Sequence, residues 1–156
     1  MKIKSIGGDK YFVTFIDDAS KKLWVYILRT KEQVFQVFQK FHALIERDTG
    51  RKLKRLRTDN EGEYTSREFE EYCSNHEIRH EKTVPGTPQH NGVAERMNRT
   101  IVEKVRSMLR MAKLPKTFWD EVVRTACYLI NCSPSVPLEF DIPERVWTNK
   151  EMSYCT

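Results

Sequence analysis

The sequence lacks the features that mark membrane-spanning, secreted and zinc-binding proteins. None of the four cysteines forms a C-x-x-C pair and their spacing fits no zinc finger, so free thiols in a reducing compartment are expected. No apolar run approaches the roughly 18 residues of a membrane span, and residues 1–4 carry no apolar core of a signal peptide. Internal repeats and low-complexity tracts are also missing. These absences predict a protein that is not secreted.

What the sequence does contain is enough for one folded domain. A chain of 156 residues can bury most of the surface that it exposes when unfolded, so it needs no metal or disulfide for stability. Charged residues make up 31 % and apolar residues 39 %, a mixture typical of globular rather than disordered proteins. The net charge is +5 and the isoelectric point is about 9.0, which modestly favours a polyanionic partner.

Hydrophobic patterns in the first third of the chain predict a hairpin and a helix. Tyr11–Ile16 and Leu23–Leu28 are apolar stretches joined by a short polar segment, so an antiparallel pair of strands is expected. Apolar residues then recur at helical spacing as far as Gly50, which should end the helix. Thr30, followed three residues later by Gln33, has the pattern of a capping box at the start of this helix.

The rest of the chain predicts alternating strands and helices. In order, these are a strand at residues 53–58, a helix at 66–75, a strand at 78–83, a mobile loop at 84–91 and a long helix at about 92–112. Pro115 starts a further helix, whose inner face is expected to consist of Phe118, Val122, Ala126 and Ile130. After residue 131 three prolines interrupt the chain, and no long periodic segment remains. This order predicts an α/β fold in which a mixed sheet carries helices on both faces.

Two acidic residues lie at positions that can contribute to an active site. Asp59 follows a strand, and the carboxyl ends of strands in an α/β sheet are where sites usually form. Glu95 is expected in the first turn of the long helix, a common place for an acidic residue with no catalytic role. Together the two carboxylates can converge on a divalent cation such as Mg²⁺. Two such metals can hold the attacking and leaving oxygens of an in-line phosphoryl displacement.

Several separate motifs resemble the integrase catalytic core of copia-type LTR retrotransposons, which are relatives of the retroviral integrases. The two main motifs are LRTDNEGEY at residues 56–64 and PGTPQHNGVAERMNRT at residues 85–100, with 35 residues between Asp59 and Glu95. YFVTFIDDAS at residues 11–20 and PERVW at residues 143–147 match the same group. The resemblance covers nearly the whole chain, and it implies an RNase H-like mixed sheet flanked by helices.

The resemblance also implies a function, DNA integration by a polynucleotidyl transferase encoded in a Pol polyprotein. Members of this family trim element ends and join the 3′-hydroxyls to target DNA, using two Mg²⁺ ions held by two aspartates and a glutamate. Asp59 matches the second of these aspartates and Glu95 matches the glutamate. Both are therefore predicted to be catalytic ligands of Mg²⁺, or of Mn²⁺ in its place.

Four further residues are expected to contact DNA. Gln89, His90 and Asn91 match the end of the family's flexible active-site loop. Arg99 lies one helical turn after Glu95, on the same face; the alternative role for Arg99 is a surface ion pair with Glu95, worth a few tenths of a kcal/mol. The implied partners are element ends and target DNA, with a homo-oligomer as a further expectation, and the implied location is nuclear or cytoplasmic.

In the family the first Asp lies on the strand that precedes the one at Tyr11, just ahead of a Gly-Pro pair. Residues 1–6 look like the sequence just after that pair, so the first Asp is expected shortly upstream of residue 1. Residues 1–133 are therefore expected to form a catalytic core without its first strand, and residues 134–156 a proline-interrupted C-terminal extension of that core. With two of three carboxylates, metal binding should be weakened and catalysis impaired. Asp17 and Asp18 are interpreted as turn-forming residues, not as replacements.

Two alternatives to an impaired integrase core remain open. One is a non-enzymatic nucleic-acid-binding module that uses the basic surface alone. The other is a gene fragment with no independent function. The basic pairs at residues 51–52 and 54–55 are similarly ambiguous, since they suit either nuclear import or a solvated strand edge.

Overall fold

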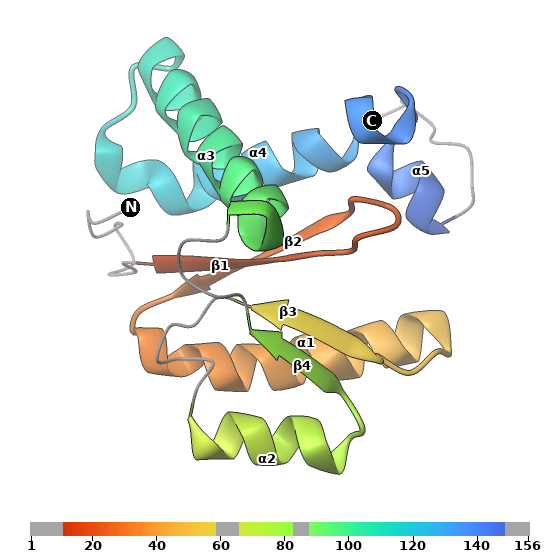
Figure 1. The fold of residues 1–156 in the computed structure, drawn as a ribbon. Helices are drawn as coiled ribbons and strands as arrows, with labels where there is room; N and C mark the ends of the chain where they lie inside the picture. The colour runs from red at the N-terminus through yellow and green to blue at the C-terminus, as the bar shows by residue number, and fades with distance from the viewer. Residues whose placement is uncertain (1–10, 59–65, 83–87, 149–156) are drawn as a thin grey trace. The chain divides into compact units, whose positions relative to one another are not determined.

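The structure, a computed structural model, describes residues 11–58, 66–82 and 88–148, with side chains in the last range from residue 94 onward. The chain divides into two compact units (Figure 1). The first consists of Met1–Arg29 and Met97–Thr156, and the second of Thr30–Arg96. The expectation of a missing first strand concerns the chain ahead of residue 11, which lies outside the described residues and stays a prediction.

The first unit contains the predicted hairpin. Strands β1 (Tyr11–Ile16) and β2 (Leu23–Leu28) pair antiparallel over their full lengths. The side chain of Asp17 closes the turn, because its Oδ2 atom accepts hydrogen bonds from the backbone N–H of Ser20 at 2.8 Å and from the Ser20 hydroxyl at 2.7 Å. The interpretation of Asp17 as a turn-forming residue is confirmed.

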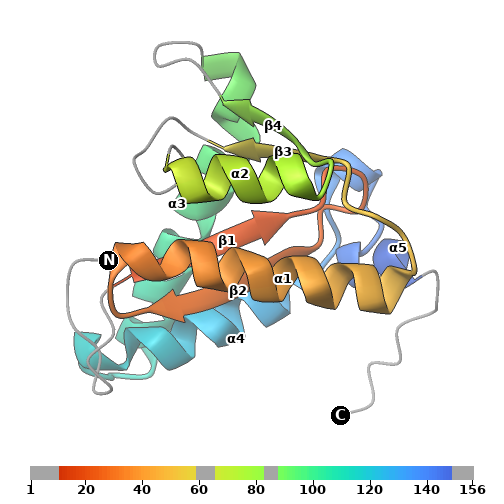
Figure 2. The same cartoon turned by 90° about the horizontal axis from the view of Figure 1, so that it is seen from below.

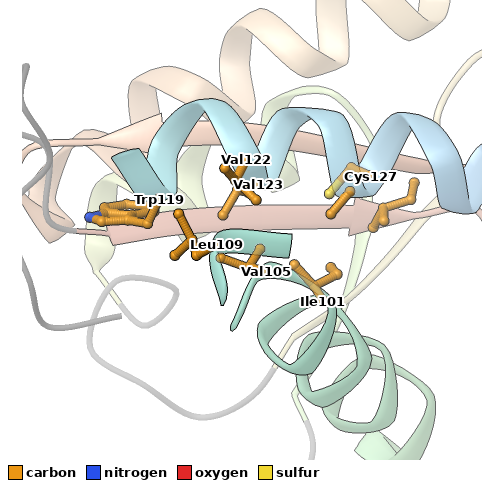
Figure 3. Close-up of a cluster of buried hydrophobic side chains, with 9 residues drawn as sticks. Ile101, Val105, Leu109, Trp119, Val122, Val123 and Cys127 are labelled. Atoms are coloured by element: carbon orange, nitrogen blue, oxygen red, sulfur yellow. The ribbon is translucent and has the colours of Figure 1, made fainter. Parts of the chain in front are cut away.

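Helices α3 (Pro88–Met111) and α4 (Trp119–Asn131) pack with β2 around the hydrophobic core of this unit. Figure 3 shows their side chains pointing toward one another between the two helices and the strand. The core side chains are Leu23, Ile101, Val105, Leu109, Trp119, Val122, Val123, Ala126 and Cys127. Asn131, the last residue of α4, ties the helix to β2: its side-chain amide donates to the Leu23 carbonyl at 2.7 Å and accepts from the Leu23 N–H at 2.8 Å.

The buried face of α4 is only partly the one predicted. Val122 and Ala126 are buried, but Phe118 and Ile130 are only partly buried. The remaining buried positions are Trp119, Val123 and Cys127. The indole of Trp119 offers more apolar area than the phenyl ring of Phe118, so burying Trp119 is more favourable. The helix is therefore rotated about its axis by about one residue relative to the prediction.

Helix α3 begins earlier than predicted. The loop expected at residues 84–91 gives way to helix at Pro88, so residues 88–91 are helical in the structure. Proline is compatible with the first helical position, where its missing N–H would have no partner in any case. Gly92, expected at the start of the helix, lies within it, at a cost of about 1 kcal/mol relative to alanine.

The chain after residue 131 is more regular than predicted. It contains a short 3-10 turn, η4 (Val136–Leu138), and a helix, α5 (Pro143–Thr148), which holds the PERVW motif. Two contacts join α5 to the hairpin: Lys22 Nζ lies 3.0 Å from Glu144 Oε2, and the rings of Trp24 and Trp147 meet edge to face at 4.9 Å.

The second unit begins with a 3-10 turn, η1 (Lys31–Gln33), that leads into α1 (Val34–Thr49). The capping box is confirmed, with the Thr30 backbone N–H donating to Gln33 Oε1 at 3.1 Å. Gly50 ends α1 with φ of 65°, the left-handed conformation in which glycine carries no steric penalty.

The remaining elements of this unit are β3 (Arg55–Thr58), α2 (Arg67–Asn75) and β4 (Arg79–Lys82). Strands β3 and β4 pair parallel, whereas β1 and β2 pair antiparallel, so the described strands form two separate two-stranded sheets. Figure 2 shows α2 alongside α1, and aromatic rings such as Phe38 and Phe69, 5.0 Å apart, fill the space between the two helices.

Two further findings concern membrane spans and cysteines. No helix in the described ranges is long and apolar enough to cross a membrane. Cys73, Cys127 and Cys132 are free, as predicted, while Cys155 lies outside the described residues. Burial raises the pKa of Cys73 to about 11 and that of Cys127 to about 12, so both are protonated, unreactive thiols at neutral pH.

Candidate active site

Glu95 projects from α3 as an exposed carboxylate. It lies seven residues after Pro88, the first residue of the helix, so the expectation that Glu95 belongs to the first turn is wrong. The reason is the earlier start of α3. Because the field of a helix N-terminus acts mainly on the first turn, it does not account for an acidic residue here. The exposed side chain is instead free to bind a ligand.

Arg99 is one turn further along α3, and its side chain is also exposed. Within the described part of the chain, Glu95 and Arg99 form no ion pair with each other. The adjacent Asn98 fixes this turn of the helix in the first unit, since the hydroxyl of Thr14 on β1 donates to its Oδ1 atom at 2.9 Å. Because Arg99 pairs with no acid among the described residues, its guanidinium N–H donors remain available for the predicted DNA contact.

The other predicted site residues are only partly described. The backbones of Gln89, His90 and Asn91 belong to the start of α3, and their side chains lie outside the described residues. Asp59 also lies outside them, directly after Thr58, the last residue of β3. Asp59 and Glu95 fall in the same compact unit.

A partly buried polar network lies beside the end of β3, and the sequence did not predict it. The hydroxyl of Thr58 lies 2.7 Å from His80 Nε2, and His80 Nδ1 lies 3.4 Å from Glu70 Oε1. The Nζ atom of Lys82 contacts the same carboxylate oxygen. The side chain of His80 is only 4 % exposed, although the strand that carries it is polar in sequence. His76 is the C-cap residue of α2.

Burial and charge set the protonation of this network. Burial lowers the pKa of His80 below its usual value, and the hydrogen bond from Lys82 lowers the pKa of Glu70. His80 is therefore neutral and Glu70 ionised at neutral pH. We assign the single imidazole proton to Nδ1, facing Glu70, which leaves Nε2 to accept from the Thr58 hydroxyl. The distance of 3.4 Å between His80 Nδ1 and Glu70 Oε1 is too long for a good hydrogen bond.

The described residues can supply part of a metal site. Among them, no group of three His, Cys, Asp or Glu side chains lies close enough to hold a metal ion. The exposed Glu95 carboxylate is, however, a hard oxygen donor of the kind that Mg²⁺ prefers. Asp59, which belongs to the same compact unit, offers the same carboxylate chemistry. Both donor types fit Mg²⁺, and the structure shows that the Glu95 carboxylate is exposed.

Residues 1–88 match the family described as Integrase core domain. The chain is 86 % identical over 154 residues to the "Retrovirus-related Pol polyprotein from transposon TNT 1-94" of Nicotiana tabacum. It is 38 % identical over 141 residues to the "Retrovirus-related Pol polyprotein from transposon RE2" of Arabidopsis thaliana. These matches cover 99 % and 90 % of this chain but only 12 % and 10 % of the two polyproteins, so the chain spans a small part of the relatives' length.

Solved integrase structures share the fold. A chain of the simian T-cell lymphotropic virus intasome in complex with PP2A regulatory subunit B56 gamma matches with a TM-score of 0.72 and 18 % identity, over 98 % of this chain and 53 % of that one. The HTLV-2 integrase catalytic core domain in complex with magnesium matches with a TM-score of 0.68 and 19 % identity, over 94 % and 90 % of the respective chains. At this identity the likeness shows the fold, which is RNase H-like. With its fold and its sequence in agreement, the chain belongs to the integrase core domain family.

Proposed function

We propose that this chain supplies Asp59 and Glu95 to the active site of a metal-dependent polynucleotidyl transferase that acts in DNA integration. The observation that carries the proposal is the exposed carboxylate of Glu95 on α3, within a family-matching motif and in the same compact unit as Asp59. Arg99, exposed one turn away, is suited to hold a DNA phosphate beside this carboxylate.

Mg²⁺ is the proposed metal, with Asp59 and Glu95 as its protein ligands. The HTLV-2 integrase core is described in complex with magnesium, and both ligands here are carboxylates. A bound Mg²⁺ would stabilise negative charge on the oxygens of the reacting phosphate. The buried hydrogen bond between Thr58 and His80 would hold the end of β3, and so limit the positions open to Asp59.

The test compares duplex affinity with and without Mn²⁺. Fluorescence anisotropy should show a severalfold gain in duplex affinity for the unmodified chain in Mn²⁺ over EDTA, because a cation held by Asp59 and Glu95 would supply positive charge for a DNA phosphate. Asp59→Asn and Glu95→Gln should each remove this gain. Glu103→Gln is the matched control, since Glu103 is an exposed acid two turns further along α3. Equal affinity in Mn²⁺ and EDTA would contradict the proposal and favour a non-enzymatic binding module.

Self-association and location extend the proposal. The HTLV-2 core is described in trimeric and dimeric forms, which supports a homo-oligomer for this chain as well. Sedimentation equilibrium should then show a mass above that of one chain, and a single-chain mass at all concentrations would contradict this extension. A DNA substrate also supports action in the nucleus after synthesis in the cytoplasm.

A further inference from the structure

The segment that leads into β3 is strongly basic. Residues 51–57 contain five basic residues and no acidic one. All five side chains are exposed, and they are Arg51, Lys52, Lys54, Arg55 and Arg57. Nothing in the proposed active site uses them. Exposed charge on this scale either remains solvated or meets a partner of opposite charge.

Pairing with β4 arranges part of this charge as a fixed array. Side chains alternate along β3, so that Leu56 and Thr58 face the interior while Arg55 and Arg57 face solvent. In the parallel register, Arg79 of β4 lies opposite Arg55. The three arginine side chains are 61 %, 52 % and 73 % exposed for Arg55, Arg57 and Arg79 respectively. We call these three side chains the arginine face.

One carboxylate, that of Glu81, organises the arginine face. Its Oε1 atom lies 3.3 Å from Arg55 Nε and 3.5 Å from Arg79 Nε, and its Oε2 atom lies 3.6 Å from Arg57 Nη2. These separations are too long for strong hydrogen bonds, and exposed ion pairs contribute little to stability. One negative charge among three positive ones leaves the face with an excess of positive charge. It also leaves most of the guanidinium N–H donors available.

We propose that the arginine face binds the phosphate backbone of duplex DNA. This deepens the proposed function, and rests on it, by adding a sequence-independent DNA contact to the carboxylates Asp59 and Glu95. Guanidinium groups pair with phosphate oxygens through two parallel hydrogen bonds, and a row of exposed arginines along a strand suits a linear polyanion. A nuclear import signal fits less well, because residues 55–58 are held in the ladder with β4 and are not a free segment.

The first test removes the arginine face. The triple variant Arg55→Gln/Arg57→Gln/Arg79→Gln is compared with the control Arg47→Gln/Arg67→Gln/Arg145→Gln. The control loses the same charge from exposed arginines that each pair with one acid, on α1, α2 and α5. Duplex affinity is measured by anisotropy in EDTA, between about 50 and 200 mM salt. The use of EDTA makes the result independent of metal at Asp59 and Glu95.

The expected result is a large loss for the arginine face alone. Affinity at low salt should fall at least tenfold, and the slope of log affinity against log salt should become shallower by about 2–3, because each phosphate contact contributes about 0.9 to the slope. The control should lose at most about threefold with an unchanged slope. Equal losses in the two triple variants would overturn the proposal and assign the effect to net charge.

A second variant is expected to bind duplex DNA more tightly, a result that misfolding would not produce. Glu81→Gln removes the carboxylate that the three guanidinium groups share, and duplex affinity should rise severalfold. Glu71→Gln is its control, because Glu71 is an exposed acid paired with the single arginine Arg67. No gain in Glu81→Gln over Glu71→Gln would overturn the proposal. If Mn²⁺ does not raise the duplex affinity of the unmodified chain but the arginine-face variants behave as expected, only the proposed metal site is rejected.

Discussion

The Nε2 atom of His80 lies 2.7 Å from the hydroxyl oxygen of Thr58, the residue directly before Asp59. Both side chains are buried, and His80 reaches Thr58 diagonally from its register position opposite Leu56. The bond therefore ties the last residue of β3 to the neighbouring strand. This contact restricts the backbone immediately before Asp59, one of the two proposed metal ligands.

Removing the hydroxyl of Thr58 should destabilise the chain. Thr58→Val keeps the shape of the side chain but leaves His80 Nε2 buried without its partner, so the free energy of unfolding should fall by about 1–3 kcal/mol. Urea denaturation followed by circular dichroism measures this change. Thr125→Val is the control, since the Thr125 hydroxyl is exposed and only bonds back within α4; it should change stability by no more than about 0.5 kcal/mol. Equal effects would contradict a role for the Thr58–His80 bond.

The same histidine should make stability depend on pH. Burial holds the pKa of His80 below its usual 6.5, with Glu70 raising it and Lys82 lowering it further. As the pH falls through about 6.5, the imidazole of His80 takes up a proton in the unfolded chain before it does so in the folded chain. The free energy of unfolding is therefore highest above pH 6.5, and it decreases as the pH falls toward the pKa of His80 in the folded chain. Unfolding curves between pH 7.5 and pH 5 should show a steeper loss for the unmodified chain than for His80→Gln. Parallel pH profiles would contradict this.

A second buried histidine lies between α1 and α2. His42 is only 3 % exposed; its Nδ1 atom is 2.7 Å from the Tyr72 hydroxyl and its Nε2 atom 2.8 Å from Glu46 Oε1. Tyr72→Phe should lower the free energy of unfolding by about 1–3 kcal/mol, because it leaves one imidazole nitrogen unpaired. Tyr128→Phe, at a tyrosine that is 66 % exposed, should stay within about 0.5 kcal/mol and serves as the control in thermal denaturation. A Tyr72→Phe chain as stable as the control would show that the bond contributes nothing.

Local signals in the sequence predicted local structure well. The capping box at Thr30 and the left-handed Gly50 depend only on neighbouring residues, and both are confirmed. The predicted start of α3 was wrong because Pro88 is compatible with either a loop or a first helical turn. The sequence alone does not distinguish the two. That shift also moved Glu95 out of the first turn. Its exposed side chain nonetheless fits the ligand role that the motif implied.

Features that depend on distant contacts were missed. Nothing in the sequence marks His80 as buried, since its neighbours Arg79 and Glu81 are polar. Only the pairing of β3 with β4 turns its side chain inward against α2. The helix α5 was missed for the same reason. Its six residues form no long period, and contacts such as that between Trp24 and Trp147 come from more than a hundred residues away in the sequence.

The anchoring of α3 in the first unit can be tested at Ile101. This side chain is fully buried beside Val105 and Leu109, two residues beyond the exposed Arg99. Ile101→Ala should lower the free energy of unfolding by about 2–5 kcal/mol, through lost burial and the cavity left behind. Met111→Ala, at a side chain that is 84 % exposed, should change it by no more than about 0.5 kcal/mol. If the two variants proved equally stable in urea, the core of this unit could not hold the helix that carries the candidate DNA contact.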